Sequence, residues 1–469
     1  MEIKRIRIQA YRSLWDVTLE PNPFRVIVGA NNAGKTNLLD AIHFLGEVYR
    51  HGIDIAVSRK GGFENIAHRH RRRTKRPMIF EVHAYLRPDE LPAIPLRRAA
   101  TPSARKRLLA ARRRRAKGAI IEVEHQFELK AASQAIDADF YIAQERIVLR
   151  RHDTRAGEPE NLVQVDRMRD DLSFVILGTH TGSLDEQYES DEDESPTQSE
   201  GQDIKERLAD DPWLSFVLDP LDEPGFRAFA RRRISSTRLA LQDLVYNEVF
   251  RELSSELSKT RLHRLTPLEC RKPGVPIPSP ELELHGGNLP AVVDFLKKSH
   301  PKSWKEIEKS MRSVVPRLSE VKTVYTTDRR LALQFAEEGF GRPWSAEDIS
   351  DGTIQSLALF CVLFDPRSRL VLVEEPENSV HPWIIRNFAD ACRRVTKKQV
   401  LVTSHSPVLV DHLEPSEVEV AWRSDGRTHV APLLDLDPDA AHLWAEGRNT
   451  VFEILDGGAV PQAVSGEGL

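Results

Sequence analysis

The apolar run Phe24-Arg-Val-Ile-Val28 is followed directly by Gly29-Ala30-Asn31-Asn32-Ala33-Gly34-Lys35-Thr36. The apolar run predicts a buried strand, and the residues after the loop predict a helix with Leu38, Ile42 and Leu45 on one face. The loop between them fits the pattern G-x-x-x-x-G-K-[ST] in full. Such a loop presents backbone N–H groups and the positive end of a helix dipole to phosphate oxygens. Strand, loop and helix together predict a nucleotide site in an α/β fold.

The loop residues have distinct expected tasks. Lys35 is expected to bridge the β- and γ-phosphates, and the Thr36 hydroxyl is expected to bind Mg²⁺. The residues predicted to contact ATP are Gly29, Ala30, Asn31, Asn32, Ala33, Gly34, Lys35, Thr36 and Asn37. The sequence therefore predicts ATP and Mg²⁺ as cofactors.

A second apolar strand, from Leu370 to Val373, ends in two acids, Glu374 and Glu375. Strand ends meet the ligand in α/β folds, and side chains alternate along a strand, so neighbouring acids can take different tasks. We assign Glu374 to Mg²⁺ through water and Glu375 to the base that orients the attacking water. The alternative is a solvated strand end before Pro376.

Two further motifs follow the same logic. The strand Val400-Leu-Val-Thr ends at Ser404-His405, where a histidine can hydrogen-bond the γ-phosphate and sense its loss. Upstream, Ser350-Asp351-Gly352 precedes a helix, so Ser350 can cap it while Gly352 lets a phosphate approach the backbone. A structural histidine and an ordinary helix start are the alternative interpretations.

Composition excludes several classes of protein. Of 469 residues, 40% are apolar and 29% are charged, an ordinary balance for a protein with a sizeable core. Three distant cysteines without a C-x-x-C pair exclude a disulfide scaffold. No apolar run approaches the ~20 residues of a membrane span, and the N-terminus lacks a signal peptide's apolar stretch. We therefore expect a cytoplasmic protein without a membrane partner.

The net charge of −4 conceals two oppositely charged regions. Lys and Arg cluster at 68–76, and 97–117 hold ten of them without a carboxylate, whereas 185–211 hold twelve Asp and Glu. The basic region 68–117 predicts contact with the phosphates of duplex DNA and a steep salt dependence. A solvated basic helix, or one paired with the acidic residues, is the alternative. Because 97–117 contains no aromatic residue, stacking on single strands is disfavoured.

In their order, these motifs resemble the ABC-type ATPase heads of the SMC/RecF/OLD superfamily. Within it, the likeness is to RecF-like AAA ATPases of bacterial OLD, PtuA and AriA-type phage-defence systems. The resemblance extends from Ile6-Arg-Ile-Gln-Ala-Tyr-Arg12-Ser13 to Ile42 and from residue 347 to about 413. Between these two parts it includes Gly287-Asn-Leu-Pro290. Two positions depart from relatives: Asn32 stands where they often have Gly, and Glu374 replaces the commoner Asp.

The resemblance implies further roles. Residues Ser350, Asp351, Gly352 and Gln355 would form the signature that binds the γ-phosphate of the opposite subunit, so ATP is sandwiched in a homodimer or higher oligomer. His405 would be the switch histidine, and Glu375-Pro-Glu-Asn-Ser-Val-His381-Pro would couple the two sites. Arg12 matches a basic residue that lies near the nucleotide in relatives. No segment is assigned to the glutamine loop.

The expected fold is α/β, a P-loop NTPase head of ABC type with a mixed central sheet, an antiparallel β lobe and a helical insertion. Alternating segments at 78–86, 119–129, 140–149, 162–165 and 173–177 predict the antiparallel strands. Helical periodicity follows at 225–262 and 290–315, and a hairpin is predicted at Asp425-Gly426. The predicted regions are 1–180 (N-terminal ATPase lobe with the P-loop), 181–212 (acidic disordered loop), 213–318 (helical insertion) and 319–469 (C-terminal ATPase lobe).

Several features of SMC/RecF/OLD relatives are absent from this sequence, and this limits the branches of the superfamily that it can resemble. The chain has no C-x-x-C hook and no long coiled-coil arm, and only 64 residues follow His405 (469 − 405), too few for the Toprim nuclease that ends OLD proteins. We therefore expect any nuclease or toxin effector to be a separate chain. The leading hypothesis is a dimerising ATPase that acts on DNA or on an effector in phage defence. The alternatives are a RecF-type repair ATPase, an ATP-dependent scaffold with slow turnover, and an ABC transporter subunit, which the antiparallel insertion disfavours.

Overall fold

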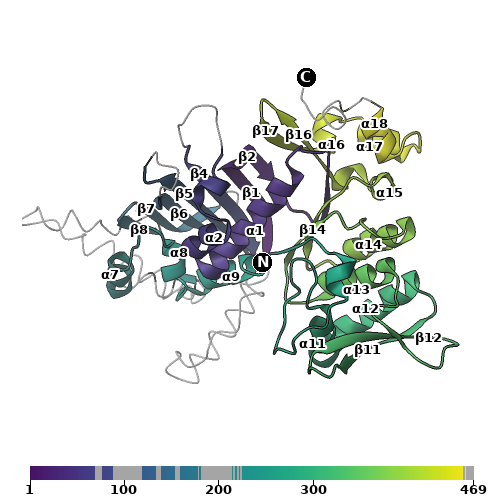
Figure 1. The fold of residues 1–469 in the computed structure, drawn as a ribbon. Coiled ribbons are helices and arrows are strands. Elements are labelled where there is room, and N and C mark those ends of the chain that lie inside the picture. The colour runs from purple at the N-terminus through teal and green to yellow at the C-terminus, as the bar shows by residue number, and fades with distance from the viewer. Residues whose placement is uncertain are drawn as a thin grey trace, which may run out of the picture. The chain divides into compact units, whose positions relative to one another are not determined.

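The chain folds into two compact units (Figure 1). The antiparallel unit comprises 1–20 and 44–258, and the parallel unit comprises 21–43 and 259–469. The computed structural model describes residues 1–68, 76–87, 119–133, 139–153, 159–177, 179–180, 214, 217–218, 221, 224–457 and 460. The basic segment 97–117, most of 68–76 and the predicted disordered loop 181–212 lie outside these residues.

The antiparallel unit is built on a sheet whose neighbouring strands run antiparallel. In spatial order its strands are β2 (Leu14–Leu19), β1 (Glu2–Tyr11), β4 (Met78–Leu86), β5 (Ala119–Ala131), β6 (Phe140–Asp153), β7 (Glu160–Met168), β8 (Asp171–Ile176) and β9 (Thr179–His180). Side chains alternate along β4, where Phe80 and Val82 are buried while Ile79 and His83 are partly exposed. The predicted antiparallel sheet is confirmed.

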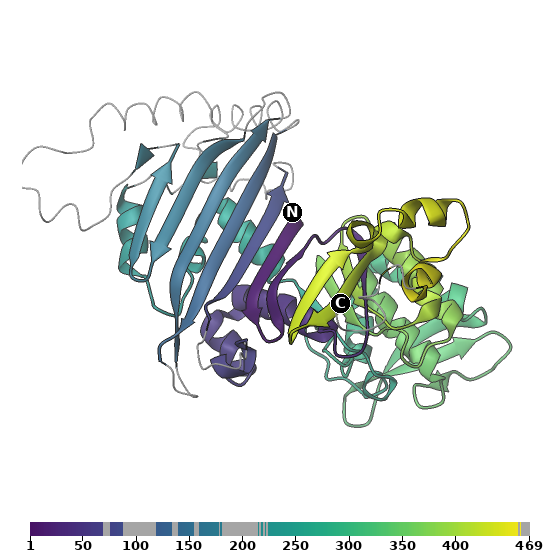
Figure 2. The same cartoon turned by 90° about the horizontal axis from the view of Figure 1, so that it is seen from above.

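Helices of this unit lie on one face of the sheet (Figure 2). They are the second half of α1 (Lys35–His51), α2 (Ile53–Arg59), α3 (Phe63–Ile66), α7 (Pro224–Arg232), α8 (Ala240–Asp243) and α9 (Glu248–Leu257). Phe44 of α1 packs on Phe80, with ring centroids 5.5 Å apart, and Phe80 stacks on Phe127 at 5.3 Å. These rings form the aromatic centre of the core, since all three are almost fully buried.

A charged network is buried in the same core, around Glu145. The carboxylate accepts hydrogen bonds from the backbone N–H groups of Ala240 (2.6 Å) and Leu241 (3.0 Å) at the start of α8. His125 Nε2 lies 3.1 Å from it and Arg167 Nη1 lies 3.7 Å from it. Because helix N-termini leave N–H groups without intrahelical partners, Glu145 ties α8 to the sheet.

The parallel unit contains a second set of strands. In spatial order they are β10 (Arg261–His263), β14 (Leu370–Glu374), β15 (Gln399–Thr403), β3 (Phe24–Val28), β16 (Val418–Ser424) and β17 (Arg427–Pro432). The first five run parallel, and β17 returns antiparallel to β16 through the predicted turn at Asp425-Gly426. Every residue of β3, β14 and β15 is buried, as in sheets covered on both faces.

Helices and a small sheet complete the parallel unit. They are α10 (Pro267–Cys270), α11 (Leu289–Ser299), α12 (Pro301–Val314), β11 (Leu318–Tyr325), β12 (Leu331–Glu337), β13 (Trp344–Ser345), α13 (Asp351–Phe364), α14 (Pro382–Arg394), α15 (Pro407–Val410), the 3₁₀ turn η2 (Pro415–Glu417), α16 (Leu433–Leu436), α17 (Ala440–Ala445) and α18 (Val451–Asp456). Helix α13 is central, because its residues from Ile354 to Leu363 are all buried. No helix in the described part of the chain is long and apolar enough to cross a lipid bilayer.

The division into units differs from the predicted regions. We expected the P-loop in an N-terminal lobe 1–180, but β3 hydrogen-bonds to β15 and β16 and belongs to the parallel unit. The predicted insertion 213–318 is likewise divided, because α7 to α9 belong to one unit and α11 and α12 to the other. The predicted helix 290–315 is interrupted before Pro301, which has no N–H to continue it.

Candidate nucleotide site

The loop between β3 and α1 has the tight geometry that its pattern predicts. Gly29 and Gly34 have φ of 145° and 99°. A Cβ at Gly29 would lie 2.0 Å from the Ala421 carbonyl oxygen, and one at Gly34 would lie 2.0 Å from Thr428 Oγ1. Both glycines are therefore required by the close approach of β16 and β17. Asn32 has φ of 67°, a left-handed conformation that asparagine tolerates.

Lys35 turns back onto its own loop. Its Nζ donates to the carbonyl oxygens of Gly29 (2.8 Å) and Ala30 (2.9 Å), and the residue is only 6% exposed. Burial lowers the pKa of Lys35 to about 8, although the nearby carboxylates, Glu375 foremost, act in the opposite direction. An anionic phosphate in the loop would restore the charged form. Lys35 is thus placed to exchange carbonyl partners for phosphate oxygens.

Thr36 and Glu374 meet as predicted. Thr36 Oγ1 donates to Glu374 Oε1 at 2.6 Å, and Glu374 ends β14 with 8% of its surface exposed. A hydroxyl and a carboxylate are the hard oxygen ligands that suit Mg²⁺. These two side chains could therefore hold a magnesium ion beside the phosphate loop.

The sequence did not reveal Arg264, the residue directly after β10. Its Nε donates to Glu374 Oε2 at 2.9 Å, and its Nη2 contacts the same oxygen. Because β10 has only three residues and pairs in parallel with β14, its position depends on tertiary contacts. The sequence carries no local signal for this ion pair.

Glu375 follows Glu374 in a left-handed conformation, with φ of 46°. For a residue with a Cβ this conformation costs about 1–2 kcal/mol, and such strain clusters at functional sites. Its N–H bonds to the Thr403 carbonyl (3.0 Å), and its Oε1 lies 3.8 Å from His405 Nε2. The predicted base and the predicted histidine are therefore neighbours in space.

Glu377 fixes the loop that carries His405. Its Oε1 accepts from Ser404 Oγ and from the His405 N–H, both at 2.8 Å, while its buried Oε2 has no partner among the described residues. Burial, followed by the charge of Lys35, lowers the pKa of His405. The imidazole is therefore neutral at pH 7 and can donate one N–H. The resemblance placed Glu377 in the loop that would couple the two sites, but its hydrogen bonds were not predicted, because they join two loops far apart in the chain.

The predicted signature starts α13. Ser350 is its N-cap, and its Oγ accepts from the Thr353 N–H at 3.2 Å, as expected. Asp351 is exposed on this turn. Gly352 has room for a side chain, since a Cβ would make ordinary contacts of 3.5–3.6 Å. Gln355 differs from expectation, because it is 1% exposed inside the unit and not on a surface that a second subunit could touch.

Arg12 and Asn37 are the two other residues that were predicted to contact ATP. Arg12 belongs to the antiparallel unit, has φ of 45°, and its Nε lies 3.4 Å from the Asn65 carbonyl oxygen. Asn37 is a partly exposed residue in the first turn of α1. Their contacts with nucleotide stay predictions.

The carboxyl edge of the parallel sheet thus brings the phosphate loop together with Glu374, Glu375 and His405, and their roles stay predictions. Sequence families identify the class of protein. Residues 157–411 match the family described as "AAA domain, putative AbiEii toxin, Type IV TA system", and residues 1–144 match "AAA ATPase domain". Because the first match spans more than half of the chain, the chain belongs to that family, within the SMC/RecF-like ABC-type ATPases.

Individual relatives are matched over a short stretch. The DNA replication and repair proteins RecF of Pseudomonas putida (strain W619) and Azotobacter vinelandii (strain DJ / ATCC BAA-1303) are each 47% identical over 47 residues, which is 10% of this chain and 13% of the relative. Among solved structures, an Smc head bound to the C-winged helix domain of ScpA has 12% identity and a TM-score of 0.40, covering 92% of this chain and 98% of that one. The SMC head domain from Thermotoga maritima has 12% identity and a TM-score of 0.33, over 92% and 99%.

Proposed function

We propose that the chain binds Mg²⁺–ATP, closes as a homodimer or higher oligomer around it, and hydrolyses it to control DNA or a separate effector in phage defence. The observation that carries this proposal is the meeting of Lys35, Thr36–Glu374 and Glu375–His405 at one edge of the parallel sheet. Each pair joins elements that are far apart in the sequence, so chance placement is a poor explanation.

Binding uses the phosphate loop. The N–H groups of residues 29–34 and the start of α1 receive the phosphate oxygens, and Lys35 moves from its carbonyl partners to the β- and γ-phosphates. Thr36 and Glu374 hold Mg²⁺, which neutralises phosphate charge when bound. These groups support the proposal that the loop binds ATP.

Hydrolysis uses the two groups beyond β14 and β15. Glu375 accepts a proton from the attacking water at a carboxylate oxygen. The neutral His405, 3.8 Å away, donates its N–H to the γ-phosphate. Asn378 Nδ2 donates to Glu375 Oε2 at 3.1 Å and helps to position the carboxylate before the substrate arrives.

The second half of the composite site comes from another copy. Ser350, Asp351 and Gly352 start α13, where backbone N–H groups without helical partners can receive the γ-phosphate of the opposite subunit. A site built in this way would need two copies, and ATP-dependent dimerisation is part of the proposal for that reason.

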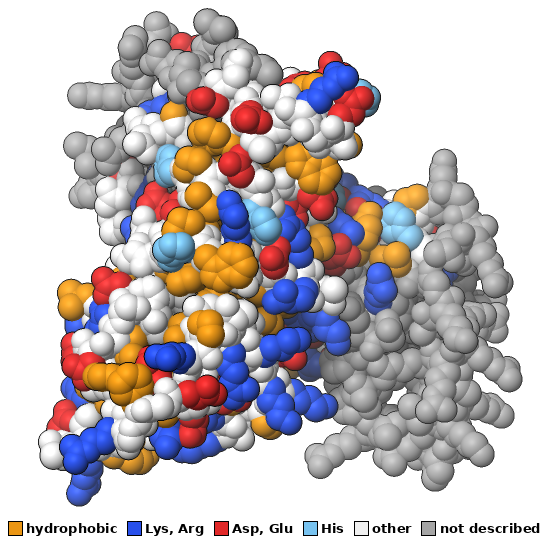
Figure 3. Space-filling view, turned by 90° about the vertical axis from the view of Figure 1, so that its right-hand side faces the viewer, with side chains coloured by type: hydrophobic (Ala, Val, Ile, Leu, Met, Phe, Trp, Pro, Cys, Tyr) orange, Lys and Arg blue, Asp and Glu red, His pale blue; other side chains and the backbone are white. Residues whose placement is uncertain are grey.

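The biological role rests on the family and on charge. The family's description names a toxin of a type IV toxin–antitoxin system, which supports a defence role. The basic region 68–117 lies mostly outside the described residues, so DNA is proposed from composition alone. On the face shown in Figure 3, acidic, basic and apolar side chains are interspersed. A repair role is the second candidate, favoured by the short match to RecF.

The test of this function is Glu375→Gln. Removing the base should lower the hydrolysis rate by about 10²–10³-fold, while the variant accumulates as an ATP-bound dimer in sedimentation velocity. The matched control is Glu306→Gln, an exposed carboxylate on α12 outside the site. Hydrolysis at the wild-type rate in Glu375→Gln would show that the base is another group.

A separate experiment tests whether duplex DNA is a partner. Hydrolysis is measured with and without duplex DNA at two salt concentrations, and stimulation that is lost at the higher salt supports DNA as the partner. Unchanged hydrolysis at both concentrations would leave the effector chain as the regulated partner and reject DNA.

A further inference from the structure

Two arginines on one short segment reach two different motifs of the proposed ATP site. We call residues 264–271 the arginine segment; it runs from the end of β10 through the single turn of α10. At one end, Arg264 contacts Glu374. At the other end, Arg271 contacts the turn that begins α13. All of these residues belong to the parallel unit.

Arg264 occupies the carboxylate that is assigned to magnesium. Its guanidinium bonds to Oε2 of Glu374, while Thr36 donates to Oε1, so both oxygens are engaged. The Arg264 side chain is 46% exposed, whereas Glu374 is 8% exposed. A guanidinium and a magnesium ion on one carboxylate would repel each other strongly at this depth. Arg264 has open solvent to move into, and Glu374 does not.

Arg271 holds the signature turn by three contacts. Its Nε donates to the Ala346 carbonyl (3.0 Å) and its Nη2 to the Ile349 carbonyl (2.7 Å), and Nη2 also forms an ion pair with Asp351 Oδ1 at 2.7 Å. Its side chain is 13% exposed while that of Asp351 is 58% exposed. The position of the turn before Ser350 therefore depends on where Arg271 lies.

The segment between the two arginines is held along its length by the neighbouring residues 284–286. The N–H of Arg264 bonds to the Leu284 carbonyl (2.8 Å), and the N–H of Thr266 bonds to the His285 carbonyl (3.3 Å). Cys270 is fully buried, and Gly286 approaches its sulfur so closely that a Cβ there would lie 2.4 Å away. Because contacts lie at both ends of the segment, we expect it to move together with these neighbours and to carry a displacement from one arginine to the other.

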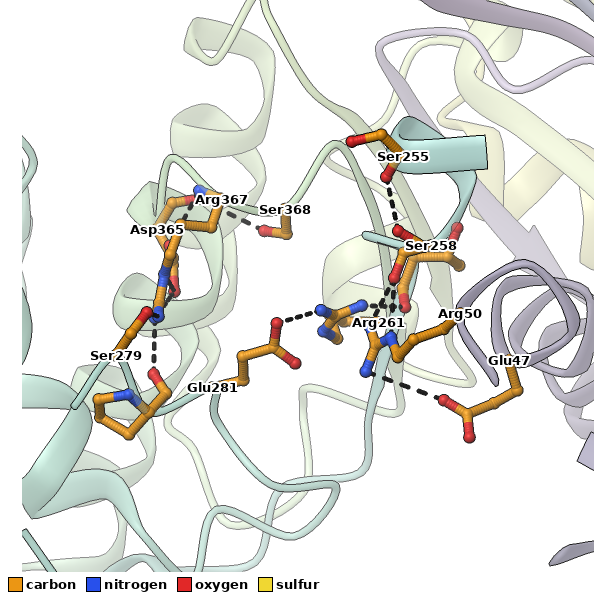
Figure 4. A network of polar contacts seen from close by, with 12 residues as sticks. Glu47, Arg50, Ser255, Ser258, Arg261, Ser279, Glu281, Asp365, Arg367 and Ser368 are labelled. Carbon is orange, nitrogen blue, oxygen red and sulfur yellow. Dashed lines mark hydrogen bonds and ion pairs between the residues drawn. The ribbon is translucent and has the colours of Figure 1, made fainter. Parts of the chain in front are cut away.

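The strand before the segment and the chain opposite it are anchored as well. Arg261 of β10 pairs with Glu281, and Arg367, which is paired with Asp365, donates to Ser279 Oγ at 3.0 Å (Figure 4). These contacts anchor β10 before the arginine segment and residues 279–281 beside it. Any movement is therefore expected within residues 264–271.

We propose that the arginine segment couples occupation of the Glu374 site to the signature turn. Without nucleotide, Arg264 holds the segment on Glu374 and Arg271 holds the turn in its resting position. When Mg²⁺–ATP engages Glu374, Arg264 leaves, the segment shifts, and Arg271 repositions the turn that meets the second copy's ATP. Arg264 and Arg271 are positioning residues, and the coupling rests on the proposed function.

Amide hydrogen exchange of 345–354 in the full chain tests the coupling. In nucleotide-free protein, Arg264→Ala should speed exchange in the first turn of α13 by at least about fivefold, the lower range of coupling between sites. The same substitution in an Arg271→Ala background should change nothing further, because the connection is already cut. Lys272→Ala is the matched control, since Lys272 is in the next position but pairs only with Glu269 among the described residues.

The outcomes separate the two proposals. In wild-type chain kept monomeric by dilution, adding Mg²⁺–ATP should reproduce the Arg264→Ala change, and Arg271→Ala should abolish it. Unchanged exchange in Arg264→Ala, or additive effects of the two substitutions, would overturn the coupling. If ATP does not bind, the proposed function fails while the nucleotide-free comparison still decides the coupling. Arg264→Gln and Arg271→Lys replace the alanine variants if either of those does not fold.

Discussion

Charged side chains cluster in two regions of this molecule. The pKa shifts in one region favour the charged form of a side chain, and those in the other favour the neutral form. On the outer face of the antiparallel sheet, a hydrogen bond from His83 together with other contacts lowers the pKa of Glu122 to about 2. At the edge of the parallel sheet, burial lowers the pKa of Lys35 to about 8. The first environment stabilises the charged form, whereas the second disfavours it.

The difference extends to hydrogen-bonding partners. Glu122 is bonded by His152 (2.7 Å), and Glu124 by Arg150 (2.7 Å), so these two carboxylates are satisfied by neighbouring side chains. Beside the P-loop, one oxygen of Glu377 is buried without a partner among the described residues. A group that is buried and incompletely satisfied indicates a place where a ligand completes the network. The comparison therefore distinguishes a site from a structural charged surface.

The largest expected effect concerns the charged network that is buried in the core of the antiparallel unit, around Glu145. Arg167→Ala removes the cation beside Glu145, leaving a buried carboxylate, and should lower the free energy of unfolding by about 3–5 kcal/mol. Urea denaturation measures this, with Arg146→Ala as the control because that side chain is 49% exposed. ATP affinity of the folded variant should stay within about twofold, since the substitution lies in the other unit. Equal stability of the two variants would contradict the role of this network.

The next largest effect is a pH dependence of ATP affinity that comes from the titration of Lys35. Phosphate raises the pKa of Lys35 above its free value of about 8, so ATP binding takes up a proton above that pH. Affinity should be constant below pH 8 and fall about tenfold by pH 9, as measured by calorimetric titration. The matched variant Lys35→Arg should remove this fall, because arginine stays charged. An identical fall in the variant would assign the proton to another group.

A small effect is expected where charges are already paired on the sheet face. Arg150→Ala removes the contact with Glu124, in which both side chains are partly exposed. The free energy of unfolding should fall by about 0.5–1 kcal/mol, and the decrease should shrink in high salt. Denaturation at two ionic strengths measures it. A decrease as large as that of Arg167→Ala would show that the sheet face carries more of the stability than its exposure indicates.

The sequence was informative where local pattern decides the structure. The strand predicted at 78–86 matches β4 residue for residue, and the predicted turn at Asp425-Gly426 joins β16 and β17. Glu375 and His405 were predicted to belong to one site, and they are 3.8 Å apart. These features follow from alternation, turn chemistry and the convergence of parallel strand ends.

Long-range pairing explains what the sequence did not reveal. Arg264 follows a strand of three residues whose place is set by its register with β14. The contacts of Arg271 with the α13 turn join positions more than seventy residues apart. The placement of β3 in the parallel unit depends on its pairing with β15 and β16. No local pattern encodes such partners.

The central claim is that the edge of the parallel sheet binds Mg²⁺–ATP through Lys35. Calorimetric titration of Mg²⁺–ATP into the wild-type chain and into Lys35→Ala tests it most directly, with Lys60→Ala, a lysine of the antiparallel unit, as the control. We predict saturable binding to the wild type and the control, and a loss of at least about tenfold in affinity for Lys35→Ala, the value of a charged hydrogen bond. Equal affinity in all three proteins would contradict the account.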